Sequence, residues 1–203
     1  MTTTEEFDSL YAGDPDPWQV ASSWYERRKI EIVLACLRRP RHGFVWDAGC
    51  GTGELTAALA ARADRVLATD PSAQAVALAG ARLAGEANVH LERSTLPARP
   101  ESLTDAPDLV VLSEVLYYLS AADRQATYAL LDEVSHPETD LAIVHWGPRT
   151  EGATCSGLAA FNEASSELNA RGWGRLVTHT DAEFLIGLFS KDIPDEVGGR
   201  DDA

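Results

Sequence analysis

The sequence predicts an α/β fold: a seven-stranded, mostly parallel sheet with helices on both faces and an antiparallel last strand. Three observations predict it. Short apolar runs alternate with helical patterns through the middle of the chain, and this alternation is typical of a doubly wound parallel sheet. The run 108–112 is almost wholly apolar, as expected for a strand at the centre of such a sheet. Two strand-like runs, 175–180 and 184–189, follow with no helix between them, which indicates an antiparallel pair.

The first predicted helix begins after Ser23 and ends before Pro40. Ser23 and Glu26 have the spacing of a capping box, in which each side chain bonds to the other residue's backbone N–H. Apolar residues then recur at helical intervals until the proline. The preceding segment, 7–18, is aromatic and too rich in proline to form one regular element. We expect the helix to lie over the mouth of a cofactor site.

The remaining elements are predicted from apolar runs and from residues that favour helix N-termini. Strands are expected at 44–47, 65–70, 88–93, 108–112 and 141–146, and helices from Glu54, from Ser72, over 120–134 and over 158–168. The Ser72 hydroxyl can cap its helix, because it can accept a bond from an unpaired N–H of the first turn. Ser120 and Asp123 have the spacing of a second capping box.

The length indicates one domain with a substantial core. The chain has 203 residues, which is ordinary for a single α/β domain. We expect a cap segment with its helix at 1–41, packed on the cofactor mouth, and a cofactor-binding core at 42–195. The tail at 196–203 is rich in Gly and Asp, and we expect it to be disordered.

The charge and cysteine content exclude several classes of function. A net charge of −15 disfavours DNA or RNA as a direct partner, because nucleic-acid binding relies on basic surface. It fits a neutral or cationic small substrate, although solubility alone explains it equally well. The three cysteines are widely spaced and form no C-x-x-C pair, so we expect no disulfide framework and no metal site. No apolar run reaches about 18 residues and the start lacks a signal-peptide pattern, so we expect a cytoplasmic protein without membrane association.

A glycine-rich turn follows the first predicted strand and opens a helix, which is the geometry of a cofactor cradle. The glycines are Gly49, Gly51 and Gly53, and Glu54 stands where the dinucleotide fingerprint requires its last glycine. An acidic side chain there would repel a pyrophosphate. Asp47 is placed to meet a cationic group of a ligand instead. The alternative is a tight strand-to-helix turn without a ligand.

Asp70 ends the second predicted strand, at about the distance beyond the glycine turn where nucleotide-binding folds place a ribose-binding acid. A carboxylate can accept hydrogen bonds from both ribose hydroxyls. The alternative is that Asp70 only caps the helix that follows Pro71 and Ser72.

Ligands of doubly wound sheets bind outside the carboxyl ends of the strands, where the strand order reverses. The residues predicted at such ends are Asp47, Gly49, Gly51, Asp70, Thr95, Ser113, Glu114, His145 and Trp146. One site can therefore gather all of them.

The pattern D-x-G-x-G-x-G from Asp47 to Gly53 resembles motif I of the class I S-adenosylmethionine (SAM) methyltransferases. Two further signatures narrow the resemblance: D-P-W at 16–18 with Y-E and Lys at 25–29, and L-S-E-V-L-Y-Y-L at 112–119. Together they resemble the nodulation N-methyltransferase (NodS-like) branch, over about 7–191. Members of that branch methylate an amine of a chito-oligosaccharide, and the fold and cofactor transfer more safely than the substrate.

The resemblance implies a role for each matching position. The methionine loop would be formed by Asp47, Gly49, Gly51 and Gly53, and the ribose and adenine would meet Asp70, Pro71, Thr95 and Leu96. Ser113 and Glu114 would line the sulfonium side. Tyr25 and Lys29 would cap the cofactor, with Lys29 pairing with its carboxylate.

Methyl transfer from a sulfonium depends largely on positioning, and an amine nucleophile needs only to lose a proton. His145 could accept that proton, or it could be a strand-end residue bonded to the backbone. Glu114 could orient the amine, or it could be a helix N-terminal acid. Tyr117, Tyr118 and Trp146 are core or rim residues in one interpretation and an enclosure for a sugar or a cation in the other.

The sequence therefore predicts a SAM-dependent methyltransferase acting on a small-molecule acceptor, with N-methylation of an amino sugar or related amine favoured. O-methylation of a natural-product hydroxyl and non-catalytic SAM binding remain alternatives. A nicotinamide oxidoreductase is disfavoured by Glu54.

Overall fold

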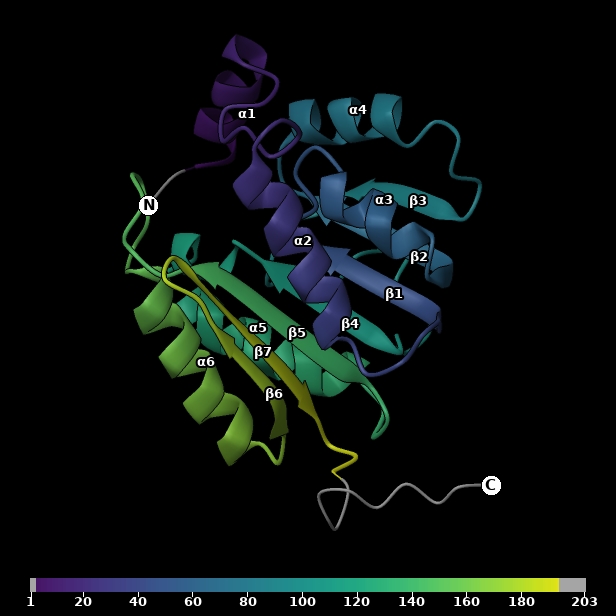
Figure 1. Ribbon diagram of the computed structural model, residues 1–203, viewed down its shortest axis with the longest axis vertical. Coiled ribbons are helices and arrows are strands. Elements are labelled where there is room, and N and C mark those ends of the chain that lie inside the picture. The colour runs from purple at the N-terminus through teal and green to yellow at the C-terminus, as the bar shows by residue number, and fades with distance from the viewer. Residues whose placement is uncertain (1–2, 194–203) are drawn as a thin grey trace.

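The structure is a computed structural model that describes residues 3–193. The elements are α1 (Thr4–Gly13), α2 (Trp24–Cys36), β1 (His42–Ala48), α3 (Glu54–Ala60), β2 (Ala63–Asp70), α4 (Ala73–Arg82), β3 (Val89–Arg93), β4 (Leu109–Ser113), the 3-10 helix η1 (Leu116–Tyr118), α5 (Ala121–Val134), β5 (Asp140–Trp146), α6 (Gly157–Ala170), β6 (Gly174–Thr180) and β7 (Phe184–Ser190). Figure 1 shows them around one twisted sheet. The tail predicted to be disordered, 196–203, lies outside the described residues.

The seven strands form one sheet in the order β3-β2-β1-β4-β5-β7-β6. The first five strands pair in parallel, and β7 lies antiparallel to both of its neighbours. The predicted fold, with its reversed last strand, is confirmed. The order reverses between β1 and β4, so a crevice opens at the carboxyl ends of these two strands, where such sheets bind ligands.

Alternation of side chains along the central strands supplies two apolar layers, one on each face of the sheet. Trp46 and Leu112 pack with residues of α5 and α6, whereas Val45 and Val111 pack with residues of α2 and α3. In Figure 1, α2 crosses in front of the sheet and α5 lies behind it. Each large apolar side chain buried in this way contributes about 1.5–3 kcal/mol. The two cores fix the strand ends that carry polar residues.

The N-terminal segment is more regular than the sequence predicts, because residues 4–13 form a helix. Thr3 and Glu6 make a true capping box, with both reciprocal bonds present. The prolines that argued against a regular element both come after the helix ends. No residue of α1 is fully buried, so its sequence lacks the apolar stripe by which most helices are found.

Helix α1 is tied to the N-terminus of α4. The Asp8 carboxylate accepts a bond of 2.6 Å from the Ser72 hydroxyl and one of 3.2 Å from the Gln74 backbone N–H. Ser72 in turn caps α4 through the Ala75 N–H, as predicted. In Figure 1, α1 lies beside the start of α4 at the carboxyl edge of the sheet. This attachment holds α1 over the crevice.

Only the caps survive from the two predicted capping boxes. Ser23 accepts from the Tyr25 N–H at 3.1 Å, but Glu26 bonds to a lysine side chain and not back to Ser23. Ser120 accepts from the Asp123 N–H, and its hydroxyl donates to the Asp123 carboxylate. Both helices therefore begin where predicted, but neither acidic side chain accepts a bond from the backbone N–H of its serine.

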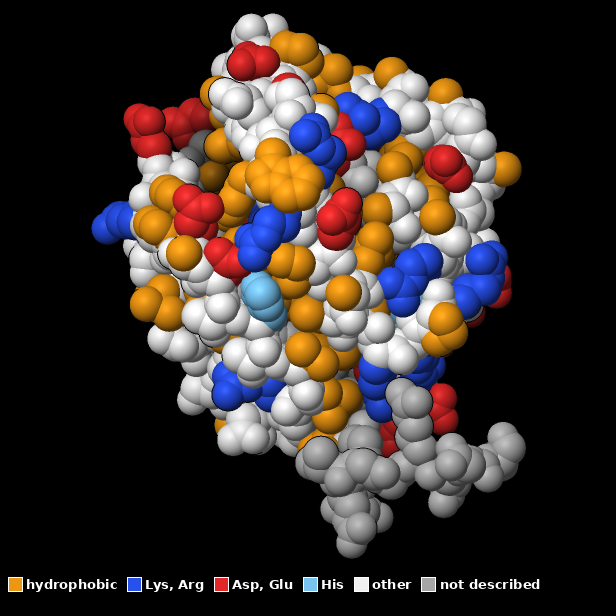
Figure 2. Space-filling view, viewed as in Figure 1, with side chains coloured by type: hydrophobic (Ala, Val, Ile, Leu, Met, Phe, Trp, Pro, Cys, Tyr) orange, Lys and Arg blue, Asp and Glu red, His pale blue; other side chains and the backbone are white. Residues whose placement is uncertain are grey.

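Among residues 3–193 no helix combines the length and the apolar character that crossing a bilayer requires. On the face shown in Figure 2, basic and acidic side chains are interspersed, and they do not form one continuous basic patch.

Candidate active site

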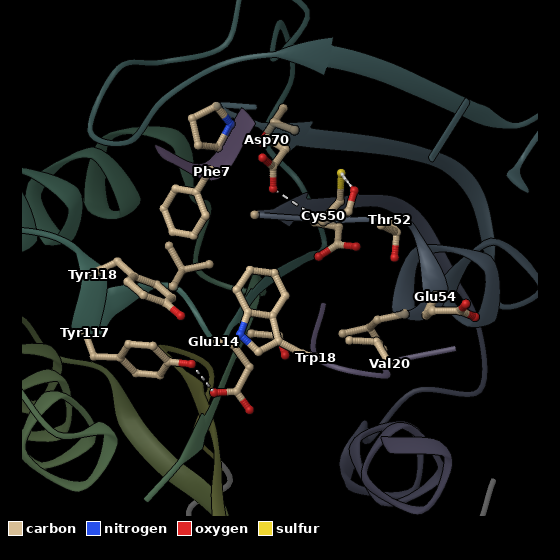
Figure 3. A pocket seen from close by; sticks show the side chains of 18 of the residues that line it. Phe7, Trp18, Val20, Cys50, Thr52, Glu54, Asp70, Glu114, Tyr117 and Tyr118 are labelled. Atoms are coloured by element: carbon tan, nitrogen blue, oxygen red, sulfur yellow. Dashed lines mark hydrogen bonds between the residues drawn. The ribbon is translucent and has the colours of Figure 1, made fainter. Parts of the chain in front are cut away.

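A cavity of about 750 Å³ lies at the carboxyl ends of β1, β2 and β4. Its floor is the glycine turn after β1 and the segment after β4, and its roof is made of α1, the loop 14–22 and α2. Figure 3 shows side chains from both parts pointing into the same space. The size suits a cofactor together with a small molecule.

The glycine turn adopts backbone angles that other residues rarely reach. Gly49 has φ 93° and Gly51 φ 53°, and a Cβ on Gly49 would lie 2.2 Å from a methyl group of Val115. The N–H groups of Gly49 and Cys50 both bond to the Thr69 carbonyl of β2, at 2.7 and 2.9 Å. These two bonds fix the backbone of the turn beside the cavity. Only glycine fits at its first position.

Gly53 does not line the cavity, in contrast to the role predicted for it. It has φ 85° and is the N-cap of α3. A Cβ at Gly53 would lie 3.0 Å from Leu83 and 3.3 Å from Ala79 of α4. The lack of a side chain at Gly53 lets α4 pack closely against the turn.

Asp47 is a buried carboxylate at the cavity floor. It accepts a bond of 2.6 Å from the Thr56 hydroxyl, and among residues 3–193 no Lys or Arg pairs with it. Burial raises the pKa of Asp47 to about 6, against the lowering effect of the Thr56 bond. Such a group is better stabilised when a cation reaches it.

Asp70 is a buried carboxylate that supports both the glycine turn and the start of α4. Its carboxylate accepts from the Ser72 N–H at 2.9 Å and from the Gly51 N–H at 3.0 Å. It also lines the cavity, and Figure 3 shows its bond to the turn at the cavity edge. Burial raises the pKa of Asp70 to about 6. Its remaining lone pairs are free for hydroxyl donors.

Glu114 stands at the opposite end of the cavity in a strained backbone conformation, with φ 61°. Its carboxylate accepts three bonds of 2.8 Å, from the Lys29 ammonium, the Tyr117 hydroxyl and the Trp146 N–H. Burial alone would raise the pKa of Glu114, but Lys29 and the other donors bring it below its usual value. Glu114 is therefore a fixed anion, and a strained residue of this kind points to function.

Lys29 is buried between two carboxylates. Its ammonium lies 2.8 Å from Glu26 and 2.8 Å from Glu114. Burial lowers the pKa of Lys29, but the two acids outweigh that effect and raise it. Two carboxylates and one ammonium leave one negative charge in excess. The predicted pairing of Lys29 with a cofactor carboxylate is thus in competition with two protein partners.

Glu26 is a cavity residue that the sequence interpretation missed. The capping-box spacing predicts instead that the Glu26 carboxylate accepts a bond from the backbone N–H of Ser23. The signal that could have found it is the three-residue separation from Lys29, which places both side chains on one face of a helix.

His145 is placed away from the cavity, which argues against its predicted role as a base. Its side chain is fully buried and does not line the cavity. Its ring packs against the ring of Tyr117, with centroids 5.2 Å apart. Both ring nitrogens lack a hydrogen-bond partner, and burial lowers the pKa of His145 to about 4. The neutral imidazole of His145 is separated from the cavity by Tyr117 and cannot reach an acceptor there.

Aromatic rings make up much of the remaining wall. Phe7 packs edge-on against Tyr118, with centroids 5.0 Å apart, and Tyr11 packs against Trp18 at 5.5 Å. In Figure 3 the Trp18 indole projects into the cavity above Glu114. Tyr117, Tyr118 and Trp146 all line the cavity, while Tyr117 also belongs to the buried core and Tyr118 packs against it. The rings from α1 and the following loop were not predicted as site residues.

The loop that carries Trp18 is braced from within. The Asp16 carboxylate accepts from the Val20 N–H at 2.7 Å and from the Ala21 N–H at 3.2 Å. Gln19 adopts φ 57°, which sharpens the turn. The bonds inside this turn hold the indole on a defined loop at the cavity roof.

Most of the predicted site residues meet in this one cavity. Those that line it are Tyr25, Lys29, Asp47, Gly49, Gly51, Asp70, Pro71, Thr95, Leu96, Ser113 and Glu114. Gly53 and His145 do not.

Comparison with known proteins agrees with this architecture. A family model described as Nodulation protein S (NodS) matches residues 8–180. Nodulation protein S of Bradyrhizobium diazoefficiens is 28% identical over 166 residues, which cover 77% of this chain and 78% of that protein. A crystal structure of a putative methyltransferase from Pseudomonas syringae is 35% identical, with a TM-score of 0.70 over 83% of this chain and 99% of that chain.

A further structure shares the fold at lower identity. It is N-methyltransferase NodS from Bradyrhizobium japonicum WM9 in complex with S-adenosyl-L-homocysteine (SAH). It matches with a TM-score of 0.80 at 20% identity, over 95% of this chain and all of that chain.

The fold, the cavity at the switch point and these relatives define a SAM-dependent methyltransferase. The chain belongs to the NodS family, because the family model spans most of its length.

Proposed function

We propose that this methyltransferase acts on an amine nitrogen of a small molecule, an amino sugar or a related compound. One observation carries the proposal: Glu26, Lys29 and Glu114 leave one negative charge in excess in the cavity wall. An ammonium that enters the cavity would supply the missing positive charge. The rings of Trp18 and Tyr118 favour a cation as well, since aromatic faces attract positive charge. A NodS relative of the same fold carries the name N-methyltransferase.

The cofactor fits the other end of the cavity. Asp47 is buried, lacks a cationic partner among residues 3–193 and has a raised pKa, so the ammonium of the methionine part would stabilise it. The bare backbone of Gly49 and Gly51 permits close approach. Asp70 has lone pairs to spare for ribose hydroxyls.

The outer parts of the cofactor have matching walls. Pro71, Thr95 and Leu96 would border the adenine, while Tyr25, Lys29, Ser113 and Glu114 would border the sulfonium. These assignments rest on the position of each residue in the cavity and on the family motifs.

The chain contributes mainly position and electrostatics. When bound, SAM supplies an electrophilic methyl group on a positively charged sulfur. Glu114, fixed by its three donors, would hold the acceptor's nitrogen near that methyl group. The aromatic roof from Phe7 to Trp18 would exclude water, which strengthens each electrostatic contact. Positioning of this kind supplies a large part of the rate gain in displacement reactions.

Matched pairs of acceptors test the proposal. Benzylamine and benzyl alcohol differ only in the group that would be methylated, and glucosamine and N-acetylglucosamine differ in whether the amine is free. We expect the amine of each pair to be methylated with a kcat/KM at least about tenfold higher than its partner, a difference of about 1.4 kcal/mol, measured by mass spectrometry of the product. Methylation of the alcohol in preference to the amine would contradict the proposal.

A further inference from the structure

Two carboxylates share Lys29, but their surroundings are unequal. Glu114 has three donors: Lys29, the Tyr117 hydroxyl and the Trp146 N–H. Glu26 has Lys29 alone, at 3.0 Å from one carboxylate oxygen and 2.8 Å from the other. A carboxylate offers about four lone-pair positions. Most of those of Glu114 are occupied, whereas Glu26 retains free positions while lining the cavity.

The two acids are also held with different rigidity. Glu114 bridges β4 and β5, since its backbone N–H bonds to Val144 and its carboxylate accepts from Trp146. Glu26 lies in the first turn of α2, and its side chain bonds only to Lys29 of the same helix. Glu114 is thus suited to hold a charge in place. Glu26 is suited to change its protonation state.

The charges that face Glu26 come from each element around it. Lys29 lies on its own helix, Glu114 and Tyr117 follow β4, and Asp16 belongs to the roof loop. Tyr25 precedes Glu26 on α2. Burial raises the pKa of Glu26 and outweighs the lowering effect of Lys29, with further raising from Glu114 and Asp16. A pair of acids whose pKa values are driven in opposite directions is typical of divided acid–base roles.

We propose that Glu26 is the catalytic base, which takes the proton from the acceptor's ammonium while Glu114 holds the nitrogen in place. This inference rests on the proposed amine acceptor. It assigns Glu26 a role in addition to the cofactor and acceptor contacts described above.

The step balances without a further reactant. The ammonium R–NH₃⁺ gives one proton to the Glu26 carboxylate and becomes R–NH₂. The nitrogen lone pair then forms a bond to the methyl carbon of SAM as the carbon–sulfur bond breaks, and that electron pair remains on sulfur in SAH. The product is R–NH₂⁺–CH₃, and Glu26 returns its proton to solvent through the cavity mouth.

The test is the Glu26→Gln variant, assayed with SAM and benzylamine. The substitution keeps the shape and removes the base, so we expect kcat at pH 7 to fall at least about 100-fold, the lower range for general-base catalysis. The loss should largely disappear above the pKa of benzylamine, where the amine is already neutral in water. The matched control is Glu31→Gln on the exposed side of the same helix, which should leave kcat unchanged.

Two measurements separate a base from a structural role. SAH affinity should match that of the wild type, and Glu26→Asp should restore part of kcat. An equal loss of kcat at all pH values would contradict the base role, as would a Glu26→Gln variant with more than half of the wild-type kcat at pH 7. In both cases the wild type still methylates the amine, so the proposed function stands. A wild type that methylates only the alcohol would overturn both.

Discussion

The two ends of the cavity are built in different ways. At the proposed cofactor end, Asp47 and the glycine turn form one continuous stretch of sequence, and Asp70 follows at the end of the next strand. At the proposed acceptor end, Lys29 and Glu114 meet although 85 positions separate them. The spacing of Asp47, the glycines and Asp70 in the sequence predicts the first group. The second group forms only when α2 packs over the sheet.

The two ends differ electrostatically as well. The pKa values of Asp47 and Asp70 are each raised to about 6 by burial, and no basic side chain of residues 3–193 pairs with either. Glu114 has its lysine, and its pKa is lowered. The end with Asp47 and Asp70 therefore has two buried carboxylates without a cationic partner among residues 3–193, whereas the end with Lys29 and Glu114 contains its own cation and one negative charge in excess. This difference is the reason why we propose a different ligand for each end.

The largest expected effect on cofactor binding comes from a change in the glycine turn. Gly49→Ala places a methyl group at φ 93°, 2.2 Å from a methyl of Val115. Backbone strain and overpacking cost about 1–3 kcal/mol each, so SAH affinity should fall at least about thirtyfold, as measured by calorimetry. Gly85→Ala, where a Cβ meets nothing within 4 Å, is the matched control. If Gly49→Ala binds SAH as tightly as the wild type, the glycine turn is not part of the cofactor site.

A smaller effect concerns pH and sharpens the contrast between the two ends. Asp47, with a pKa of about 6, is ionised at pH 7 and about nine-tenths protonated at pH 5, whereas the cofactor's ammonium stays charged throughout. SAH affinity should therefore fall at least about tenfold between pH 7 and pH 5, since Asp70 has a pKa of about 6 as well. Asp47→Asn should bind more weakly at pH 7 and depend less on pH. Affinity that rises toward pH 5 would contradict this account.

The smallest expected effect concerns His145, which does not line the cavity. His145 touches Tyr117 and has no hydrogen-bond partner, so His145→Leu removes no polar contact. We expect kcat with benzylamine to stay within about threefold of the wild type, because the base of general-base catalysis must reach the reacting proton. A loss of about 100-fold in kcat would contradict this expectation and support His145 as the base.

The sequence contains enough information for the sheet and the cofactor end. Apolar runs predict strands because their central positions are buried on both faces, and the glycine spacing reports backbone angles that only glycine adopts readily. Each of these signals is local. The positions of Asp47 and Asp70 at strand ends follow directly.

The acceptor end and the roof lie beyond what such patterns report. Glu26 has a plausible local partner in Ser23, and only the packing of α2 shows that it turns to Lys29 instead. His145 lies near the carboxyl end of β5, like several cavity residues near the ends of other strands, but its own side chain does not line the cavity. The α1 helix buries no residue completely, so its apolar pattern is too weak to find.

The division between the two ends is the central claim, and calorimetric titration with SAH of the wild type, Asp70→Ala and Glu114→Gln tests it most directly. SAH lacks the sulfonium charge, so Glu114 should matter little to its binding, whereas Asp70 would hold the ribose of either form. We predict that Asp70→Ala weakens SAH binding at least about tenfold, or about 1.4 kcal/mol, and that Glu114→Gln changes it less than threefold. Equal weakening by both variants, or a wild type that does not bind SAH, would contradict the account.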